Sequence, residues 1–214
     1  MKRLLHRGIS RIVAVTFLLI RHAAHVHLDK IFSGRLSGVP LSDIGRAQAD
    51  RLGAALSHER LDRVLCSPLD RTRQTAGTIA AAHGITVEPD DALVEIDMGD
   101  WTGRELGSFI DEPAWTAWNT QRGTARIPGG ETMAEAQARI VALLDRVAAT
   151  DDGQSVAIVS HADMIRGTVA HALGLPLDNL LRFDVGPASV TRIVWGDWGA
   201  RLMSLNEQPG EVER

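Results

Sequence analysis

Short apolar runs alternate along the chain with segments whose apolar residues recur at helical spacing. Residues 13–20 are rich in Val, Ile, Leu and Phe without alternation, which predicts a strand buried on both faces. Residues 64–66 and 155–160 form two further apolar runs of strand length. This order of strands and helical segments is typical of an α/β layered domain with a largely parallel sheet.

Four helices are predicted from periodicity and capping residues, over residues 44–57, 68–83, 133–149 and 162–174. Ser42 is the expected N-cap of the first helix. Ser67 is the expected N-cap of the second, with Pro68 at its first position. Thr132 and Glu135 form a capping box at the start of the third.

The segments outside these elements show weaker patterns. Residues 86–88 are expected to form an outer strand, and residues 182–205 two or three short strands. Residues 99–130 have weak periodicity but hold three of the five tryptophans. We therefore expect an excursion from the core over 99–130, in which the tryptophans serve as packing anchors rather than as a ligand clamp.

Length and composition favour a soluble protein with one domain. The chain has 214 residues, of which 44% are hydrophobic and 23% charged. The expected domain covers residues 12–206, between a basic N-terminal extension (1–11) and a loose tail (207–214). The net charge of -4 argues against a general nucleic-acid binder.

The location of the protein is predicted from its apolar runs and its cysteine. The longest apolar run, at residues 12–20, is about half of what a membrane-spanning helix needs, so no membrane span is expected. With the basic residues before it, this run could imitate a secretory signal. The residues directly after the run carry the chemistry described below, so we favour its retention. Cys66 is the only cysteine, and a cytoplasmic location is the preferred prediction.

Polar residues capable of chemistry follow each of the three buried strands. The first strand ends in Arg21 and His22, the second leads into Arg71 and Arg73, and the third ends before His161. In open α/β sheets, ligands bind in the crevice outside the carboxyl ends of the strands. If the three strands are neighbours, two histidines and at least two arginines therefore face one site.

The arginines point to an anionic ligand. Arg71 and Arg73 lie at the start of a helix, where the helix dipole disfavours cations unless an anion is close. Helix N-termini and arginine forks both suit phosphate oxygens. A histidine beside a phosphate can act as a nucleophile, and Glu95, between apolar neighbours, is the preferred proton donor for the leaving alcohol. Asp97 is the competing donor.

Each of these residues also has a structural interpretation. The two histidines could cap strand ends, the arginines could lie on a solvated helix surface, and Glu95 could cap a turn. His22, His25 and His27 have a spacing that could suggest zinc, but no cysteine or carboxylate set nearby completes such a site. Asp163 could orient His161 or cap the helix that it opens, and capping is the preferred interpretation. Glu131 is expected only to favour a helix start.

Together the motifs resemble the histidine phosphatase, or phosphoglycerate-mutase-like, superfamily. They lie in the expected order along the chain, at residues 19–22, 67–76, 95–103 and 159–163. The resemblance implies a three-layer α/β/α sandwich with a mostly parallel sheet and one antiparallel strand. It also implies that His22 takes the phosphoryl group, that Arg21, Arg71 and His161 surround its oxygens, and that Glu95 serves as acid and then base. No metal or other cofactor is implied.

The sequence departs from the family pattern near the first histidine. Residues 23–25 read Ala-Ala-His where the common form is Gly-Glu-Thr, and Leu28 replaces an asparagine that often contacts phosphate. Arg35 lies in a loop that keeps part of the pattern and is a candidate substrate contact. These changes do not affect the residues of the phosphoryl chemistry. They do mean that the family pattern does not identify the substrate. We expect the loop 25–40 and the excursion 99–130 to set specificity.

The preferred function is hydrolysis of a small phosphorylated metabolite through a phosphohistidine. The chain has no tyrosine, and its Glu95 segment resembles the phosphatase branch rather than the mutases. A phosphomutase, a metal-dependent hydrolase using His22, His25 and His27, and a non-catalytic phospholigand-binding protein remain the alternatives.

Overall fold

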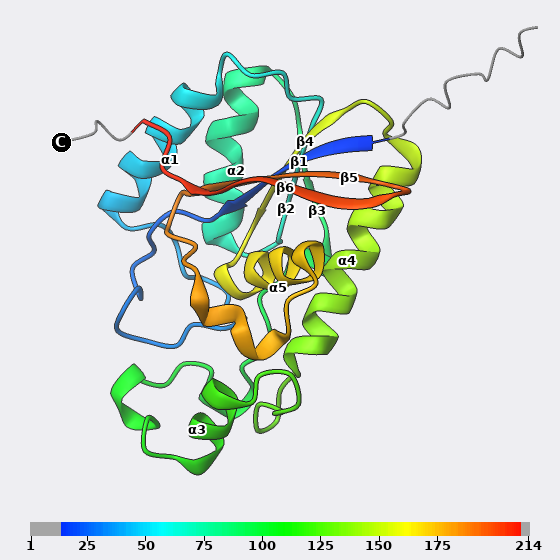
Figure 1. Cartoon of the computed structure of the whole chain (residues 1–214). Coiled ribbons are helices and arrows are strands. Elements are labelled where there is room, and N and C mark those ends of the chain that lie inside the picture. Colours follow the sequence, from blue (N-terminus) through cyan, green and yellow to red (C-terminus); the bar gives the residue numbers. More distant parts are fainter. Residues whose placement is uncertain (1–13, 211–214) are drawn as a thin grey trace, which may run out of the picture.

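The computed structural model describes residues 14–210 of the chain. Its centre is a six-stranded sheet with the order β3-β2-β4-β1-β5-β6 (Figure 1). The predicted extension at residues 1–11 and the end of the predicted tail lie outside the described residues. The strands are β1 (Ala14–Arg21), β2 (Arg63–Cys66), β3 (Val87–Pro89), β4 (Ser155–Ser160), β5 (Val190–Gly196) and β6 (Gly199–Glu207).

Strand direction in the sheet agrees with the expectation of a mostly parallel arrangement. β1 is parallel to β4, and β2 is parallel to both β3 and β4. β5 runs antiparallel to β1 and to β6, with which it forms a hairpin. In the β1–β4 register, Arg21 lies opposite Ser160, so these two strands end at the same level. The residues that follow them therefore start side by side.

Helices cover both faces of the sheet, which gives the three layers that the resemblance implied (Figure 1). The apolar side chains of β1 divide between the faces, as a buried strand without polar alternation requires. Phe17 and Leu19 join one apolar cluster with α4 and α5, while Leu18 and Ile20 join a second cluster with α1 and α2. The helices are α1 (Asp43–Leu56), α2 (Asp70–His83), α3 (Pro113–Thr120), α4 (Met133–Thr150) and α5 (Ala162–Leu173).

Most helix ends lie where the capping residues placed them. The Ser42 side chain accepts a hydrogen bond from a backbone N–H in the first turn of α1, and Thr132 and Glu135 form the expected capping box of α4. The prediction for the start of α2 was wrong, because its N-cap is Leu69 and no side chain caps it. Ser67 lies two residues earlier, so its hydroxyl is available for another contact.

The segment 99–130 packs as an aromatic subcluster at one end of the molecule and contains the short helix α3 (Figure 1). Trp101 and Trp118 are fully buried, and Trp101 stacks on Phe109 at a ring-centroid distance of 5.7 Å. These tryptophans have the packing role that the sequence predicted. The segment begins at Gly99, where φ is 44° and an added Cβ would lie 2.1 Å from the Pro128 carbonyl oxygen. Glycine is required there by both conformation and space.

Within residues 14–210, no helix is long and apolar enough to cross a membrane.

Candidate active site

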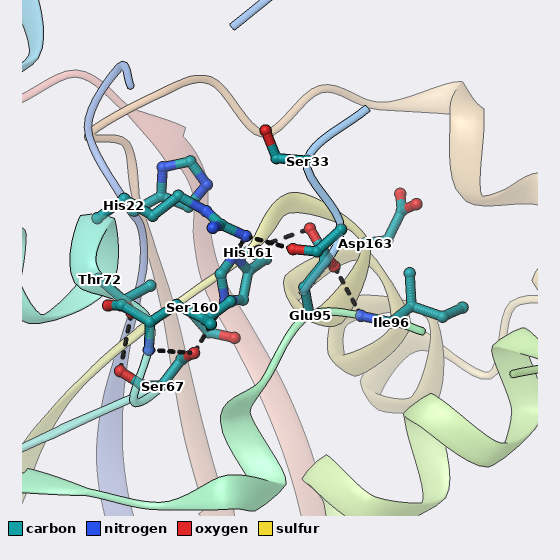
Figure 2. Close-up of polar contacts among 12 residues, drawn as sticks. His22, Ser33, Ser67, Thr72, Glu95, Ile96, Ser160, His161 and Asp163 are labelled. Atoms are coloured by element: carbon teal, nitrogen blue, oxygen red, sulfur yellow. Dashed lines mark hydrogen bonds and ion pairs between the residues drawn. The ribbon is translucent and has the colours of Figure 1, made fainter. Parts of the chain in front are cut away.

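The two histidines of the motifs meet at the carboxyl ends of β1 and β4. His22 directly follows β1 and His161 directly follows β4. Because these parallel strands are neighbours and end level, the imidazole rings lie 5.2 Å apart between centroids, at 63° (Figure 2). His22 is 4% exposed and His161 is fully buried. Two strand-end residues that are 139 positions apart thus form one pair of rings.

His22 is held with a free ring nitrogen. Its Nδ1 lies 2.8 Å from the Ala23 carbonyl oxygen, which can only accept a hydrogen bond. The proton of the neutral ring is therefore on Nδ1, and Nε2 keeps its lone pair. Burial lowers the pKa of His22 well below 6.5, and the positive charges of Arg71 and Arg21 lower it further. The ring is neutral near pH 7, as a nucleophile must be.

His161 is held from both sides of its ring. Its Nε2 lies 3.0 Å from Ser67 Oγ, while its Nδ1 lies 3.4 Å from Arg71 Nη2 and 3.7 Å from Glu95 Oε2 (Figure 2). Burial and the charge of Arg71 also lower the pKa of His161 well below its ordinary value. A hydroxyl can donate or accept, so Ser67 supports either neutral tautomer of the ring. The sequence predicts a capping role for Ser67 and gives no signal of this contact.

Two guanidinium groups, that of the buried Arg71 and that of the half-buried Arg21, lie beside the histidines. Arg71, 2% exposed in the first turn of α2, donates from Nη2 to the Gly34 carbonyl oxygen at 2.7 Å. Arg21 donates from Nη1 to the Val185 carbonyl oxygen at 2.8 Å. Nε of both residues and Nη1 of Arg71 are buried without a hydrogen-bond partner among residues 14–210. Arg73, two residues after Arg71 in α2, is exposed.

Unpaired guanidinium N–H groups indicate what the site binds. A buried donor without a partner costs free energy, which an oxyanion accepting from it would recover. The arginines border a cavity of about 220 Å³ that is open to solvent. Its lining comprises Arg21, His22, His25, Leu28, Asp29, Ile31, Phe32, Ser33, Gly34, Arg71, Glu95, Met98, Leu106 and Ala162. His161 lies behind this lining, in contact with Arg71.

Glu95 supplies the carboxyl group of the cavity. Its Oε1 accepts a hydrogen bond from the backbone N–H of Ile96 at 2.9 Å, and its side chain is 15% exposed. Burial raises the pKa of Glu95 to about 7, the Asp163 carboxylate adds to this rise, and Arg71 opposes it. A carboxyl group with a pKa near neutral can both donate and accept a proton at physiological pH.

Arg35 does not line the cavity but holds the segment that carries Glu95. Its Nε donates to the Glu95 carbonyl oxygen at 2.8 Å, and Arg139 donates to the same oxygen at 3.0 Å. Arg35 also pairs with Asp97 at 3.4 Å and with Glu131 at 3.0 Å. Arg35 is therefore placed to hold the Glu95 segment, and its expected contact with the substrate stays a prediction.

Two acidic residues have contacts that the sequence did not indicate. Asp97, the competing proton donor, faces Arg35 and does not line the cavity. Glu131 accepts from the Asp97 backbone N–H at 3.0 Å and pairs with Arg139 at 3.2 Å. The prediction that Glu131 only favours a helix start was wrong, because its carboxylate ties the start of α4 to the Glu95 segment.

Asp163 links the excursion to the site. Its carboxylate pairs with Arg122 at 3.1 Å and with Arg166 at 3.1 Å. Arg122 comes from segment 99–130 and lies over the Trp118 ring at 4.8 Å from its centroid. Asp163 makes no side-chain cap for α5, whose N-cap is His161. Its charge instead acts on Glu95, whose pKa it raises.

His25 lines the cavity, and His27 lies beside it. The His25 ring is 5.2 Å from that of His22 and 6.4 Å from that of His27, between centroids. His27 Nδ1 lies 3.3 Å from Ser33 Oγ. Within the described part of the chain, no group of three or more His, Cys, Asp and Glu side chains is arranged to hold a metal ion.

Fold and site together define a class of protein. A neutral buried histidine, two partly unpaired arginines and a carboxyl group with a raised pKa surround one cavity at the carboxyl edge of a mostly parallel sheet. Such a set suits transfer of a phosphoryl group through the histidine. Residues 17–208 match the histidine phosphatase superfamily (branch 1), and the chain belongs to this family.

Similar proteins within the family carry several names. The chain is 32% identical to phosphoserine phosphatase 1 of Hydrogenobacter thermophilus, over 90% of this chain and 92% of that protein. It is 33% identical to a probable phosphoglycerate mutase of Yersinia pestis, over 73% of this chain and 74% of that protein. The crystal structure of a putative alpha-ribazole-5'-P phosphatase from Escherichia coli matches with a TM-score of 0.81 and 27% identity, covering 93% of this chain and 99% of that one.

These findings confirm the predicted family, the fold class and an enzyme of the phosphatase class. The named relatives act on different alcohols or acceptors, so family membership leaves the substrate of this chain open.

Proposed function

We propose that the protein hydrolyses phosphate monoesters of small metabolites through a phosphohistidine at His22, without a metal ion or other cofactor. The main supporting observation is the hydrogen bond between His22 Nδ1 and the Ala23 carbonyl oxygen, which leaves Nε2 as the free nucleophile beside two guanidinium groups. A cytoplasmic location belongs to the same proposal and is supported by the single, unpaired Cys66.

The reaction has two steps. His22 Nε2 attacks phosphorus while the bond to the ester oxygen breaks, and Glu95, protonated at the outset, gives its proton to the leaving alcohol. The ionised Glu95 then takes a proton from a water molecule that attacks the phosphohistidine, which releases inorganic phosphate and restores both residues. Arg21, Arg71 and His161 neutralise and orient the phosphoryl oxygens through both steps.

The nucleophile is tested with phenyl phosphate in the presence of a metal chelator. We expect His22→Ala to lose at least about a thousandfold in kcat, because the covalent route is removed. His58→Ala, at an exposed position, is the matched control. Brief incubation with labelled substrate should leave acid-labile label on the wild type and on His58→Ala. A His22→Ala variant as active as the wild type would overturn the assignment, and loss of activity in chelator would favour a metal-dependent hydrolase.

The phosphate contacts are tested on one helix. Arg71→Ala removes a buried charge-assisted contact and should cost ~2–5 kcal/mol in kcat/KM, together with weaker inhibition by inorganic phosphate. Arg73→Ala, two residues away but exposed, is the control and should keep wild-type kinetics. Equal kinetics for both variants would remove Arg71 from the phosphate site.

A phosphomutase is the second candidate, since one relative carries that name. It differs in the acceptor of the phosphoryl group. Hydrolysis predicts release of one phosphate per alcohol formed, even with a large excess of an added acceptor alcohol. Transfer of most of the label to that acceptor would instead identify a mutase, and binding of phosphate esters without turnover would identify a non-catalytic protein.

A further inference from the structure

Apart from the groups of the phosphoryl chemistry, the lining of the cavity is mainly apolar. Besides the residues of the phosphoryl chemistry, its lining includes the apolar side chains Leu28, Ile31, Phe32, Met98 and Leu106. The cavity volume of about 220 Å³ is below the roughly 300–1,000 Å³ of sites for drug-sized ligands. This part of the cavity is where the alcohol of the ester must lie, since the arginines and His22 take the phosphoryl end.

The positive charges that line the cavity match the negative charges of one phosphate monoester and leave none for a second anionic group. Among the described residues of the lining, Arg21 and Arg71 are the only arginines or lysines. Their two positive charges match the two negative charges of a phosphate monoester. A carboxylate on the alcohol would add a third negative charge and would enter a lining that also contains Asp29. Like charges brought together in a partly desolvated site repel each other strongly.

Nearby arginines are already bound to other groups. Arg35 pairs with Asp97 and Glu131 behind the site. Arg104 pairs with Glu112 at 2.8 Å and donates to the Ser108 carbonyl oxygen at 3.0 Å. A substrate carboxylate would have to break these contacts to gain a cation. Lys30 is exposed in the loop beside the cavity and does not line it, so it is the side chain whose contribution the test must exclude.

His25 supplies a neutral donor to the same cavity. The backbone N–H of His27 donates to His25 Nδ1 at 3.3 Å, so the proton of the neutral His25 ring is on Nε2. Burial and the charges of Arg71 and Arg21 lower the pKa of His25 to about 4, so the ring carries no charge near pH 7. It can donate a hydrogen bond to a hydroxyl or ester oxygen, but it offers no charge to a carboxylate.

We propose that the substrates of this site are phosphate monoesters of uncharged, largely apolar alcohols, and that alcohols bearing a carboxylate are rejected. The proposal rests on the proposed hydrolase function. It separates this chain from any relative that acts on a phosphorylated acid without an ammonium group of its own, such as a phosphoglycerate, because such an acid needs a third cation at the alcohol end.

Two matched substrate pairs test the proposal. Phenyl phosphate is compared with 4-carboxyphenyl phosphate, and glycerol 3-phosphate with 3-phosphoglycerate, at pH 7.5 and low ionic strength. We expect kcat/KM to be at least about tenfold higher for the uncharged member of each pair, with a smaller ratio in high salt. Equal or faster hydrolysis of the carboxylates would overturn the substrate class while leaving the hydrolase function in place. If none of the four esters is hydrolysed, both the substrate class and the hydrolase function are overturned.

Variants at the mouth of the cavity test the physical cause. Leu28→Lys adds a cation to the lining. It should lower the ratio of kcat/KM for the uncharged ester to kcat/KM for the carboxylate ester by about tenfold, whereas Leu28→Met should not lower this ratio. Lys30→Met should leave the ratio as in the wild type. If Lys30→Met selectively slows the carboxylate esters, or if Leu28→Lys leaves the ratio unaltered, the charge argument is wrong.

Discussion

Glu95 should make the protein less stable at the pH where it is active. Burial raises the pKa of Glu95 from its ordinary 4.5 to about 7. At ~1.36 kcal/mol per pKa unit, the ionised carboxylate destabilises the folded protein by about 3 kcal/mol. The folded protein holds this proton between pH 4.5 and 7, where the unfolded chain has largely lost it. This destabilisation of the folded protein is therefore complete above pH 7. It decreases as the pH drops from 7 towards 4.5 and is absent below that value.

The variant Glu95→Gln isolates this effect. The amide is neutral and keeps an oxygen that can accept from the Ile96 backbone N–H, so the local hydrogen bond is retained. We expect the variant to unfold in urea with a free energy about 3 kcal/mol above that of the wild type at pH 8, and under about 1 kcal/mol above it at pH 5. Its turnover should fall sharply, because an amide donates no proton to the leaving oxygen.

The control is Glu105→Gln, since Glu105 lies exposed on the excursion. This variant should show no pH-dependent gain in the free energy of unfolding. A Glu95→Gln variant whose stability gain is the same at pH 5 and pH 8, or absent at both, would refute a raised pKa of Glu95 as the source of the cost.

Three further predictions follow from the site and its surroundings. The kcat/KM for phenyl phosphate should fall about tenfold per pH unit above pH 7, as Glu95 loses its proton, and a rate that still rises at pH 9 would contradict this role. Ser67→Ala should lower the free energy of unfolding by ~1–3 kcal/mol and reduce kcat, because the fully buried His161 ring loses a partner. Wild-type stability in urea titration together with wild-type kcat in a steady-state assay would count against this role of Ser67. Gly99→Ala should cost at least about 2 kcal/mol, through its positive φ and a backbone clash, whereas Gly107→Ala meets no neighbour; equal melting temperatures for the two would contradict the clash.

Much of the fold could be predicted from the sequence because its signals are local. The apolar composition of residues 13–20 indicated burial on both faces, and Phe17 to Ile20 are at most 1% exposed. The pair Thr132 and Glu135 marked the start of α4, because a capping box involves residues only three apart. The start of α2 was predicted wrongly because a Ser-Pro pair fits a helix start on composition alone, while the observed helix begins at Asp70.

The candidate site was predicted in part. The strand ends placed His22, Arg71 and His161 near one another, since the carboxyl ends of neighbouring parallel strands share an edge, and the structure brings these residues together. The contact between Ser67 and His161 spans 94 positions and depends on which way two side chains point. No periodicity or motif spacing encodes that direction.

The sequence by itself determined the order of elements, the buried strands and the types of residue available for phosphoryl chemistry, because each depends on neighbours in the chain. Only the tertiary structure decided which groups face the cavity and with what charge. Arg35 pairs with Glu131, which the sequence did not indicate, and the pKa of Glu95 is raised by its burial and by Asp163, which is 68 positions away. Burial and the distances between charges are properties of the packed molecule, and they set the protonation states on which the chemistry depends.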